Sequence, residues 1–322
     1  MKFRTRVALS LALTAIAASA AAQTYPDRPI RVLVPVPAGG NPDVLARSVT
    51  PGMSELLGQP LVIDNRGGAG GRIAAELVAR AAPDGYTLFL TSPGALTIVP
   101  HLSQDVPYDT NRDFTAIGLI ATGPFLLLTH PSVPVKSVKE LIALAKAEPG
   151  KLLYSSAGNG TANHLAMELF KSAAGVNFTH VPYKGAPQAV TDLLAGRVNV
   201  TLNSTAAVLA HIKAGRLNAL AVAGPKRSPL LPGVPSMNEA GVPGYESGSW
   251  LGLVAPAKTP RQIIQRLNEV MLKVLGNAET RARIEALGAE PAGTSPEQFA
   301  AMLRRESAAH AKIVKAAGVK VD

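Results

Sequence analysis

Short apolar runs bounded by glycine or proline alternate with longer segments along most of the chain. Runs of this length are typical of strands, and the segments between them carry helix start and stop signals. Strands are expected at 30–36, 61–64, 86–91, 115–121, 124–129, 151–155, 178–182, 198–202, 218–223 and 250–255, and helices at 42–57, 72–81, 137–147, 161–173, 187–195, 205–214, 260–275, 278–287 and 296–317. Strand–helix–strand order with short loops predicts an α/β protein with parallel-rich sheets.

The ends of two helices carry the clearest local signals. Asn41 is expected to cap the first helix, Pro42 fills its first position without wasting a hydrogen bond, and Asp43 lies near the positive end of the dipole. Gly58 is expected to end this helix. A Ser-x-x-Gln capping box at 295–298 precedes the last helix.

The elements fall into two successive α/β sets followed by an all-helical tail. One strand ends at a Gly-Pro break at 123–124 and another leaves the Pro/Gly-rich connection 224–248, so the chain is expected to cross twice between two lobes. We expect the first lobe at 23–124 plus 247–322, with the helical tail packed on it, and the second lobe at 125–246.

The N-terminal residues 1–22 are interpreted as a secretory signal peptide. Basic residues precede the apolar run 7–17, which is shorter than the roughly 20 residues that span a bilayer. Small residues offer a cleavage site near Ala22-Gln23. No cysteine is present for lipid attachment. The mature chain is therefore expected in the periplasm, without a membrane anchor.

Composition and charge narrow the class of protein further. Without cysteine, disulfides, thiolate nucleophiles and cysteine-ligated metal centres are impossible. Aromatic residues make up 4% of the chain, which is few for platforms that stack bases or sugars. The net charge of +10 comes from scattered basic residues. A nucleic-acid partner is therefore not expected, and the positive field would instead help to collect anionic solutes.

The motifs of several enzyme classes are incomplete in this sequence. Gly68-x-Gly70 is followed by Ile73 where a dinucleotide-binding loop has its third glycine, and Gly150-Lys151 lacks the rest of a P-loop. Neither a G-x-S-x-G nor an H-E-x-x-H motif occurs. The six histidines are isolated, without metal-ligand spacing. No enzyme activity, cofactor or metal is therefore expected.

Three loops lie at the carboxyl ends of predicted strands, where parallel α/β sheets bind ligands. They are 37–41, 91–94 and 155–161, and all contain glycine. The first and third precede helices, so free backbone N–H groups and the helix dipole would favour an anion there. Two such loops in separate lobes could close on one carboxylate. Tight turns alone are the alternative explanation for their glycines and small polar residues.

Further motifs resemble one family of receptors, in order over nearly the whole mature chain. They include Tyr25-Pro26, Pro37-Ala38-Gly39-Gly40, Ala82-Pro83-Asp84-Gly85-Tyr86-Thr87, Ser156-Ala157-Gly158-Asn159-Gly160, His180-Val181-Pro182-Tyr183-Lys184-Gly185 and Ser295-Pro296-Glu297-Gln298-Phe299. In them the chain resembles the Bug-type receptors of tripartite tricarboxylate transport systems. The resemblance implies a two-lobed type II periplasmic binding protein (a Venus flytrap). Such a receptor captures a small carboxylate for an inner-membrane permease of large and small subunits.

The resemblance also implies which residues meet the ligand. In the family the carboxylate is held by the loops that match 37–43 and 155–161, partly through ordered water. Asp43 is expected to steady its loop rather than to touch the anion. The expected donors are Gly39, Gly40, Ser156, Ala157 and Thr161. The full set of expected ligand-binding residues is Pro37, Ala38, Gly39, Gly40, Asn41, Asp43, Ser92, Ser156, Ala157, Gly158, Asn159, Thr161, His164, Tyr183 and Asn203.

Asn203 departs from the family pattern with a chemical consequence. The matching strand in the family commonly ends in phenylalanine-aspartate, whereas here it ends in Leu202-Asn203. An aspartate would pair with an ammonium group, so Asn203 favours a carboxylate without an amine. Two other functions stay open at this point. One is a sensor that presents its closed form to a membrane signalling partner, and the other is a secreted hydrolase that uses hydroxyls near Ser92 and Ser156.

Overall fold

The computed structural model describes residues 25–102 and 105–317, so the expected signal peptide, 1–22, lies outside the described residues. The strands are β1 (Ile30–Val34), β2 (Leu61–Asn65), β3 (Thr87–Thr91), β4 (Phe114–Thr129), β5 (Leu153–Ser156), β6 (Thr179–Pro182), β7 (Val200–Ser204), β8 (Asn218–Val222), β9 (Gly248–Pro256) and β10 (Glu290–Pro291). The helices are α2 (Asn41–Leu57), α3 (Arg72–Ala79), α4 (Val99–Leu102), α5 (Thr110–Asp113), α6 (Val138–Ala147), α7 (Ala162–Ala174), α8 (Ala186–Leu194), α9 (Thr205–Lys213), α10 (Arg261–Gly276), α11 (Ala278–Ala286) and α12 (Pro296–Ala317), with short helical turns η2 (Ala69–Gly71) and η3 (Gly94–Ile98). Among the described residues no helix has the length and apolar character needed to cross a membrane.

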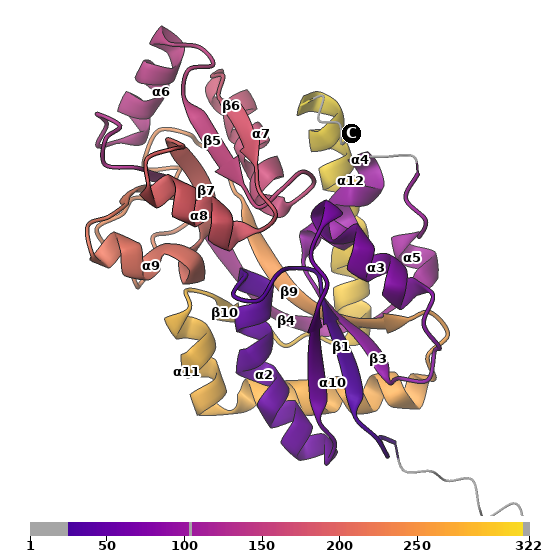
Figure 1. Cartoon of the computed structure of the whole chain (residues 1–322). Helices are drawn as coiled ribbons and strands as arrows, with labels where there is room; N and C mark the ends of the chain where they lie inside the picture. The colour runs from indigo at the N-terminus through magenta and orange to yellow at the C-terminus, as the bar shows by residue number, and fades with distance from the viewer. Residues whose placement is uncertain (1–24, 103–104, 318–322) are drawn as a thin grey trace, which may run out of the picture.

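The strands form one mixed sheet that divides into two parts. Its order is β2-β1-β3-β9-β4-β7-β5-β6, and β10 and β8 add to β4. β1, β2 and β3 are parallel in one part, and β5, β6 and β7 in the other. We call the part with β1, β2, β3 and β10 the first lobe and the part with β5 to β8 the second lobe (Figure 1). The expected parallel-rich α/β fold is confirmed.

One expected strand end is wrong, because the segment expected as two strands at 115–121 and 124–129 is a single strand. β4 runs without interruption from Phe114 to Thr129 and joins the two lobes. Its ladder with β9 ends at Pro124, and its ladder with β7 begins at Phe125. Proline lacks the N–H that a central strand normally donates. Pro124 stands where β4 changes partners, so the strand continues through it.

Both faces of the first-lobe sheet are buried, which explains its continuously apolar strands. In β1, Val32 and Val34 face a core shared with α2, α10 and α11, while Leu33 faces a core shared with α3 and α12. Gly252 of β9 leaves room for the ring of Phe299 from α12, since a Cβ there would overlap the ring. The helical tail is thus packed on the first lobe, as expected.

The second lobe is built in the same way around β7 and the end of β4. Leu127 and Leu202 belong to a core that α6 and α7 cover, whereas Leu126 faces a core that α8 and α9 cover. The tail helix reaches this lobe as well, because Val314 of α12 packs with Leu165 of α7. The two lobes are therefore connected by β4 and β9 and touch through α12.

The start of α2 differs from the expectation. Gly40, not Asn41, occupies the N-cap position, and no side chain caps the first turn. Asp43 instead reaches back to the N–H of Gly39. The helix ends at Gly58 in the left-handed conformation, as expected.

Two further helix starts test the sequence signals. The helical segment from Gly94 to Leu102 was not expected, because the sequence there has no cap signal and contains Pro100. The capping box at 295–298 is confirmed by its two reciprocal hydrogen bonds, of 2.9 and 3.2 Å. The sequence signals for helix capping therefore gave the correct helix start where a side chain makes the cap.

Candidate ligand-binding site

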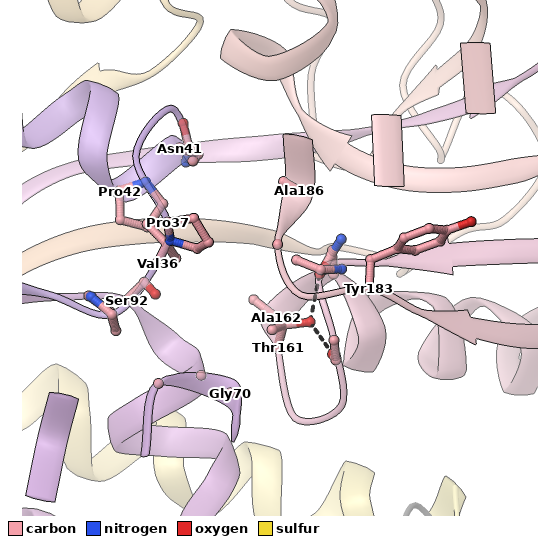
Figure 2. A pocket seen from close by; sticks show the side chains of 18 of the residues that line it. Val36, Pro37, Asn41, Pro42, Gly70, Ser92, Thr161, Ala162, Tyr183 and Ala186 are labelled. Carbon is pink, nitrogen blue, oxygen red and sulfur yellow. Dashed lines mark hydrogen bonds between the residues drawn. The ribbon is translucent and has the colours of Figure 1, made fainter. Parts of the chain in front are cut away.

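A cavity of about 420 Å³ lies between the two lobes. Loops that follow β1, β2 and β3 form one wall, and loops that follow β5, β6 and β7 form the other. Figure 2 shows Pro37 and Asn41 on the first wall opposite Thr161 and Ala186 on the second. The ring of Tyr183 points away from the first wall (Figure 2), and its hydroxyl donates to Asp192 at 2.7 Å. Tyr183 therefore contributes mainly its backbone.

A second hollow of about 1050 Å³ differs from this cavity in its charges. It is lined by β4 and β9 at their crossing between the lobes, by α7, by α12 and by the segment 223–230. Charges of both signs line it: Glu246, Glu285, Glu290 and Glu306, together with Lys226 and Arg227. Of the described residues that line the smaller cavity, none is a carboxylate, and Lys184 is the one that carries a charge. A small anion therefore meets no carboxylate in the smaller cavity, whereas it would meet several in the larger hollow.

Five α helices begin at the smaller cavity. Each has an N-cap residue in its lining: Gly40 of α2, Gly71 of α3, Thr161 of α7, Gly185 of α8 and Ser204 of α9. In these five described helices no side chain caps the first turn. The first N–H groups of a helix have no partner inside the helix and carry the positive end of its dipole. The cavity thus collects hydrogen-bond donors with partial positive charge.

The first-lobe loop is held from behind by a buried carboxylate. Asp43 accepts hydrogen bonds from the N–H of Gly39 at 2.9 Å and from Nε of Arg47 at 3.1 Å. A third comes from Nδ2 of Asn65 at 3.0 Å. Burial raises the pKa of Asp43, but these hydrogen bonds outweigh it and hold the pKa below its usual value. The carboxylate is ionised, and Arg47 neutralises it outside the cavity.

The second-lobe loop is held by two neutral imidazoles. Nε2 of His180 lies 2.6 Å from Oγ of Ser156, and the N–H of Gly160 donates to Nδ1 of His164 at 3.3 Å. The two rings stack with their centroids 4.2 Å apart. Burial, followed by the effects of His164 and Lys171, lowers the pKa of His180 to about 3. Burial also lowers the pKa of His164. Both rings are uncharged at neutral pH.

Several expected donors are already engaged inside these loops. The N–H of Gly39 is taken by the carboxylate behind it. The N–H of Ala157 donates to Oδ1 of Asn163 at 3.3 Å, and the hydroxyl of Thr161 donates to the carbonyl of Gly158 at 2.6 Å. The N–H groups left for a ligand are those of the first helical turns.

Comparison with known proteins identifies the family. Residues 45–319 match the family model described as the tripartite tricarboxylate transporter family receptor. The chain belongs to this receptor family. Protein BugT of Bordetella pertussis is similar to it, with 37% identity over 98% of this chain and 97% of its own length. The UPF0065 protein in the tcbD-tcbE intergenic region of Pseudomonas sp. strain P51 is 39% identical, over 97% and 94%.

Solved structures of similar proteins share the fold of this receptor. Rpa4515 of R. palustris with adipate matches with a TM-score of 0.89 and 40% identity, over 92% of this chain and 99% of its own. MatC of Rhodopseudomonas palustris with bound malate matches with a TM-score of 0.86 and 32% identity, over 90% and 100%. The periplasmic binding protein BugD matches with a TM-score of 0.87 and 36% identity, over 92% and 99%. The expected two-lobed binding-protein fold is confirmed.

The tripartite tricarboxylate transporter receptors are solute-binding proteins, so this receptor is not an enzyme and the hydrolase alternative is wrong. The geometry around Ser156 agrees with that conclusion. Ser156 pairs with His180 but is 0% exposed. Its hydroxyl supports the loop and does not open into the cavity.

The structure brings most of the expected ligand-binding residues of this receptor together. Ten line the cavity: Pro37, Gly40, Asn41, Ser92, Ala157, Gly158, Asn159, Thr161, Tyr183 and Asn203. Five lie outside the lining: Ala38, Gly39, Asp43, Ser156 and His164. The contact of each residue with ligand stays a prediction.

Other lining residues were not expected. The Gly-rich loop 68–71 was considered as a dinucleotide-binding motif and not as a ligand-binding loop, although it follows a strand like the other loops. Phe125 and Ser249 come from β4 and β9 between the lobes. The sequence predicted a strand at 124–129 but gave no signal that it lines the site. Ser204 follows Asn203 at the end of β7, and its position at a strand end was the signal that could have found it.

Proposed function

We propose that this receptor captures a small carboxylate without an amine group in the cavity between its lobes and delivers it to the permease of a tripartite transport system. The observation that carries the proposal is the convergence of five uncapped helix N-termini on a cavity without carboxylates in its described lining. A carboxylate only accepts hydrogen bonds, so it matches the free N–H groups. An ammonium group would meet partial positive charge and no acidic partner.

The preference of the cavity for an anion is strengthened because several helix N-termini act on one ligand. A single helix N-terminus favours a nearby anion by about 0.3–1 kcal/mol at an exposed site and up to about 2 kcal/mol where it is partly buried. The cavity is lined by both lobes, and Lys184 adds a full positive charge to its lining. The ligands named for two similar proteins, adipate and malate, are carboxylates without amines and support this class.

We further propose that the lobes close on the ligand about β4 and β9, with the first lobe at 23–124 plus 247–322 and the second at 125–246. The two lobes approach each other closely at two places. A Cβ on Gly160 would lie 3.0 Å from Cδ1 of Leu102, and one on Gly185 would lie 3.0 Å from Cγ of Pro37. Ligand stabilises this closed form through its higher affinity for it than for an open form.

The partner and the compartment follow from the family and from the N-terminal sequence. We propose an inner-membrane permease of large and small subunits as the partner, and the periplasm as the compartment, reached after cleavage near Ala22-Gln23. The family of the chain favours transport over the sensor alternative.

Calorimetric titration of the unfolded and refolded protein, stripped of carried-over ligand, tests the proposal. The panel contains mono-, di- and tricarboxylates, aromatic acids and acidic amino acids. We expect a carboxylate without an amine to bind and to raise the melting temperature as its concentration rises. Binding of amino acids alone, or of nothing in the panel by folded protein, would overturn the proposal.

Two variants of α8 show whether the cavity binds the anion. Ala186→Asp places a negative charge in the lining at the first position of the helix, and we expect it to weaken binding by about tenfold or more. Gln188→Glu adds the same charge on the exposed side of the same turn, outside the lining. It is the matched control, with binding expected within about twofold of the original protein. Equal effects of the two variants would place the ligand elsewhere.

A further inference from the structure

The helical segment 94–102 of the first lobe reaches the second lobe and packs against it. It consists of η3 and α4, follows β3 and lies against α12 (Figure 1). Ile98 and Leu102 of this segment share a buried apolar cluster with Leu165 of α7 and Val314 of α12. Leu165 belongs to the second lobe, so part of this burial exists only while the two lobes are together.

The second-lobe loop passes so close to this segment that it requires glycine. Gly160 has φ +76°, and a Cβ there would lie 3.0 Å from both Cδ1 of Leu102 and Cγ2 of Val99. On the first-lobe side, a Cβ on Gly70 would lie 3.1 Å from the carbonyl oxygen of Asn159. These distances are shorter than the roughly 3.5–4.0 Å of an ordinary contact between carbon atoms. The two loops can therefore approach this closely because neither glycine has a side chain.

This contact between the lobes is separate from the surface that faces a ligand. Four of its residues lie outside the described lining of the cavity: Val99, Leu102, Gly160 and Leu165. A change at one of them therefore reaches a bound ligand only through the position of the lobes.

The contact links the closing of the lobes to ligand affinity. Moving the lobes apart would expose Leu102 and Leu165 to water, and apolar burial is favourable in proportion to the area removed from water. The contact thus favours the closed form before any ligand is bound. When only part of a receptor is in the binding-competent form, its apparent affinity is reduced by that fraction.

We infer that this contact is a latch that sets the fraction of closed receptor and, with it, the affinity for ligand. The latch consists of Val99 and Leu102 of the first lobe and Gly160 and Leu165 of the second. They are positioning residues, because they act on the ligand through the lobes. The effect on affinity rests on the proposed function, whereas the effect on the ligand-free receptor does not.

A distance measurement on the ligand-free receptor tests the latch without any ligand. The chain contains no cysteine, so Lys146→Cys on α6 and Glu269→Cys on α10 place one spin label at an exposed position of each lobe. Leu102→Ala in this labelled protein should shift the label-to-label distances toward a more open form, because it removes apolar contact between the lobes.

Leu57→Ala is the matched control for Leu102→Ala. Leu57 is also almost fully buried, but it ends α2 in the core of the first lobe, outside the described lining of the cavity. Both variants should lower the melting temperature. Only Leu102→Ala should change the distances between the labels, and equal distances in the two variants would overturn the latch.

Ligand affinity gives a second readout, with adipate, the ligand named for a similar protein, as the first probe and the other carboxylates after it. We expect Leu102→Ala to bind about tenfold more weakly, mainly through faster dissociation, and Leu57→Ala to bind within about twofold of the original protein. Equal affinities of the two variants would overturn the latch and leave the proposed function standing. If the original protein bound no carboxylate, the proposed function would be overturned, and the label distances would still decide on the latch.

Filling the space at Gly160 should hold the lobes apart. Asparagine tolerates the left-handed backbone conformation better than most residues, so Gly160→Asn mainly adds a side chain against Leu102 and Val99. Gly175→Asn is the matched control, because Gly175 has φ +60° at the end of α7 and no described atom within 4 Å of its Cβ position.

We expect Gly160→Asn to open the ligand-free receptor and to weaken carboxylate binding about tenfold, and Gly175→Asn to do neither. Equal effects of the two asparagine variants on label distance and affinity would overturn the latch. In the double variant Gly160→Asn with Leu102→Ala, the losses of affinity should not add, since both changes act on one contact. Additive losses would show that the two residues act independently and would also overturn it.

Discussion

The helices that begin at the cavity between the lobes (the cleft) differ from those that begin elsewhere in whether a side chain accepts hydrogen bonds from their first-turn N–H groups. Ser137 and Asn277 cap α6 and α11 with their side chains. α2, α3, α7, α8 and α9 begin at the cavity without such caps. Thr161 and Ser204 are residue types that commonly cap helices, yet neither hydroxyl accepts a hydrogen bond from a backbone N–H in the first turn of its own helix. α10, which begins after Pro260 outside the cavity lining, is an exception.

This difference suggests a way for the fold to hold an anion by backbone N–H groups, without a cluster of basic side chains. A side-chain cap stabilises a helix by about 1 kcal/mol because it satisfies a backbone donor. In the proposed function that donor is left to the ligand, so the empty protein would lack a stabilisation that the bound protein gains. Lys184 is the one charged residue in the described lining, so the backbone supplies most of the attraction.

The largest effect is expected when a cleft helix is turned into a capped one. Ser204 has φ −68° and ψ 147°, which suits an aspartate at the N-cap. In Ser204→Asp the new carboxylate would satisfy the first turn of α9 and bring negative charge into the cavity. We expect about 1 kcal/mol more stability in the ligand-free protein and about 100-fold weaker carboxylate binding, or about 2.7 kcal/mol. Melting and calorimetric titration measure both, and unchanged affinity would contradict the comparison.

A smaller effect is expected when the support of the first-lobe loop is removed. Asp43→Ala removes the acceptor of the N–H of Gly39 and one of the two acceptors of the Asn65 amide. We expect a loss of about 2 kcal/mol of unfolding free energy together with weaker ligand binding. Denaturant unfolding gives the first and titration the second.

Arg47→Ala is the matched control for that loop. The Arg47 side chain is 55% exposed, and an exposed pair of this kind contributes under about 1 kcal/mol. A loss as large as that of Asp43→Ala would mean that the ion pair, rather than the buried hydrogen bonds, holds the loop.

Most of the fold could be predicted from the sequence, because the local signals for strands and helix caps agree with the burial of those segments in the structure. Apolar strands such as β1 and capping residues such as Ser295 identify their elements alone. β4 could not be predicted as one strand, because Gly123-Pro124 normally interrupts a strand. Its continuity depends on β9 and β7, which lie on either side of this point in the sheet and far away in the sequence.

The site could be predicted as far as its loops and no further. Strand-end position and glycine content identify the loops around Gly40 and Gly158. The supports of the second-lobe loop escaped prediction, since His164 and His180 are isolated in sequence and come together only as a stack. The missing caps also escaped it, because Thr161 and Ser204 have the sequence of capping residues, and only geometry shows that they do not cap.

Removing the cap of a helix far from the cleft is the converse of Ser204→Asp, which adds a cap to a helix at the cleft. Asn277 Oδ1 accepts hydrogen bonds from the first turn of α11, at 2.9 and 3.1 Å. Asn277→Ala should lower the unfolding free energy by about 1 kcal/mol and leave ligand affinity unchanged, because α11 does not begin at the cavity. Altered affinity with the same loss of stability would show that caps remote from the cleft also control binding.

The smallest effect is expected from a change of pH, which should destabilise the two loops at different pH values. The pKa of Asp43 lies below its usual 3.8, so the first loop loses stability only as pH falls below that value. The pKa of His180 is lowered from 6.5 to about 3, so the unfolded chain takes up a proton before the folded one does. Stability from this residue is complete above pH 6.5 and is lost as pH falls toward 3. The second loop should therefore weaken first on acidification.

At pH 5 this difference should be measurable as unfolding free energy. Because His180 is only partly buried, solvent screening reduces its contribution, and we expect a loss of about 0.5–1 kcal/mol between pH 7.5 and 5. The original protein should lose that much more than His180→Asn over the same interval, since asparagine does not titrate. Nuclear magnetic resonance of the imidazole gives an independent readout. Titration of His180 near pH 6.5 in the folded protein would show that its ring is not held neutral behind the loop. The contrast between a charged support, Asp43, in the first lobe and a neutral support, His180, in the second would then be wrong.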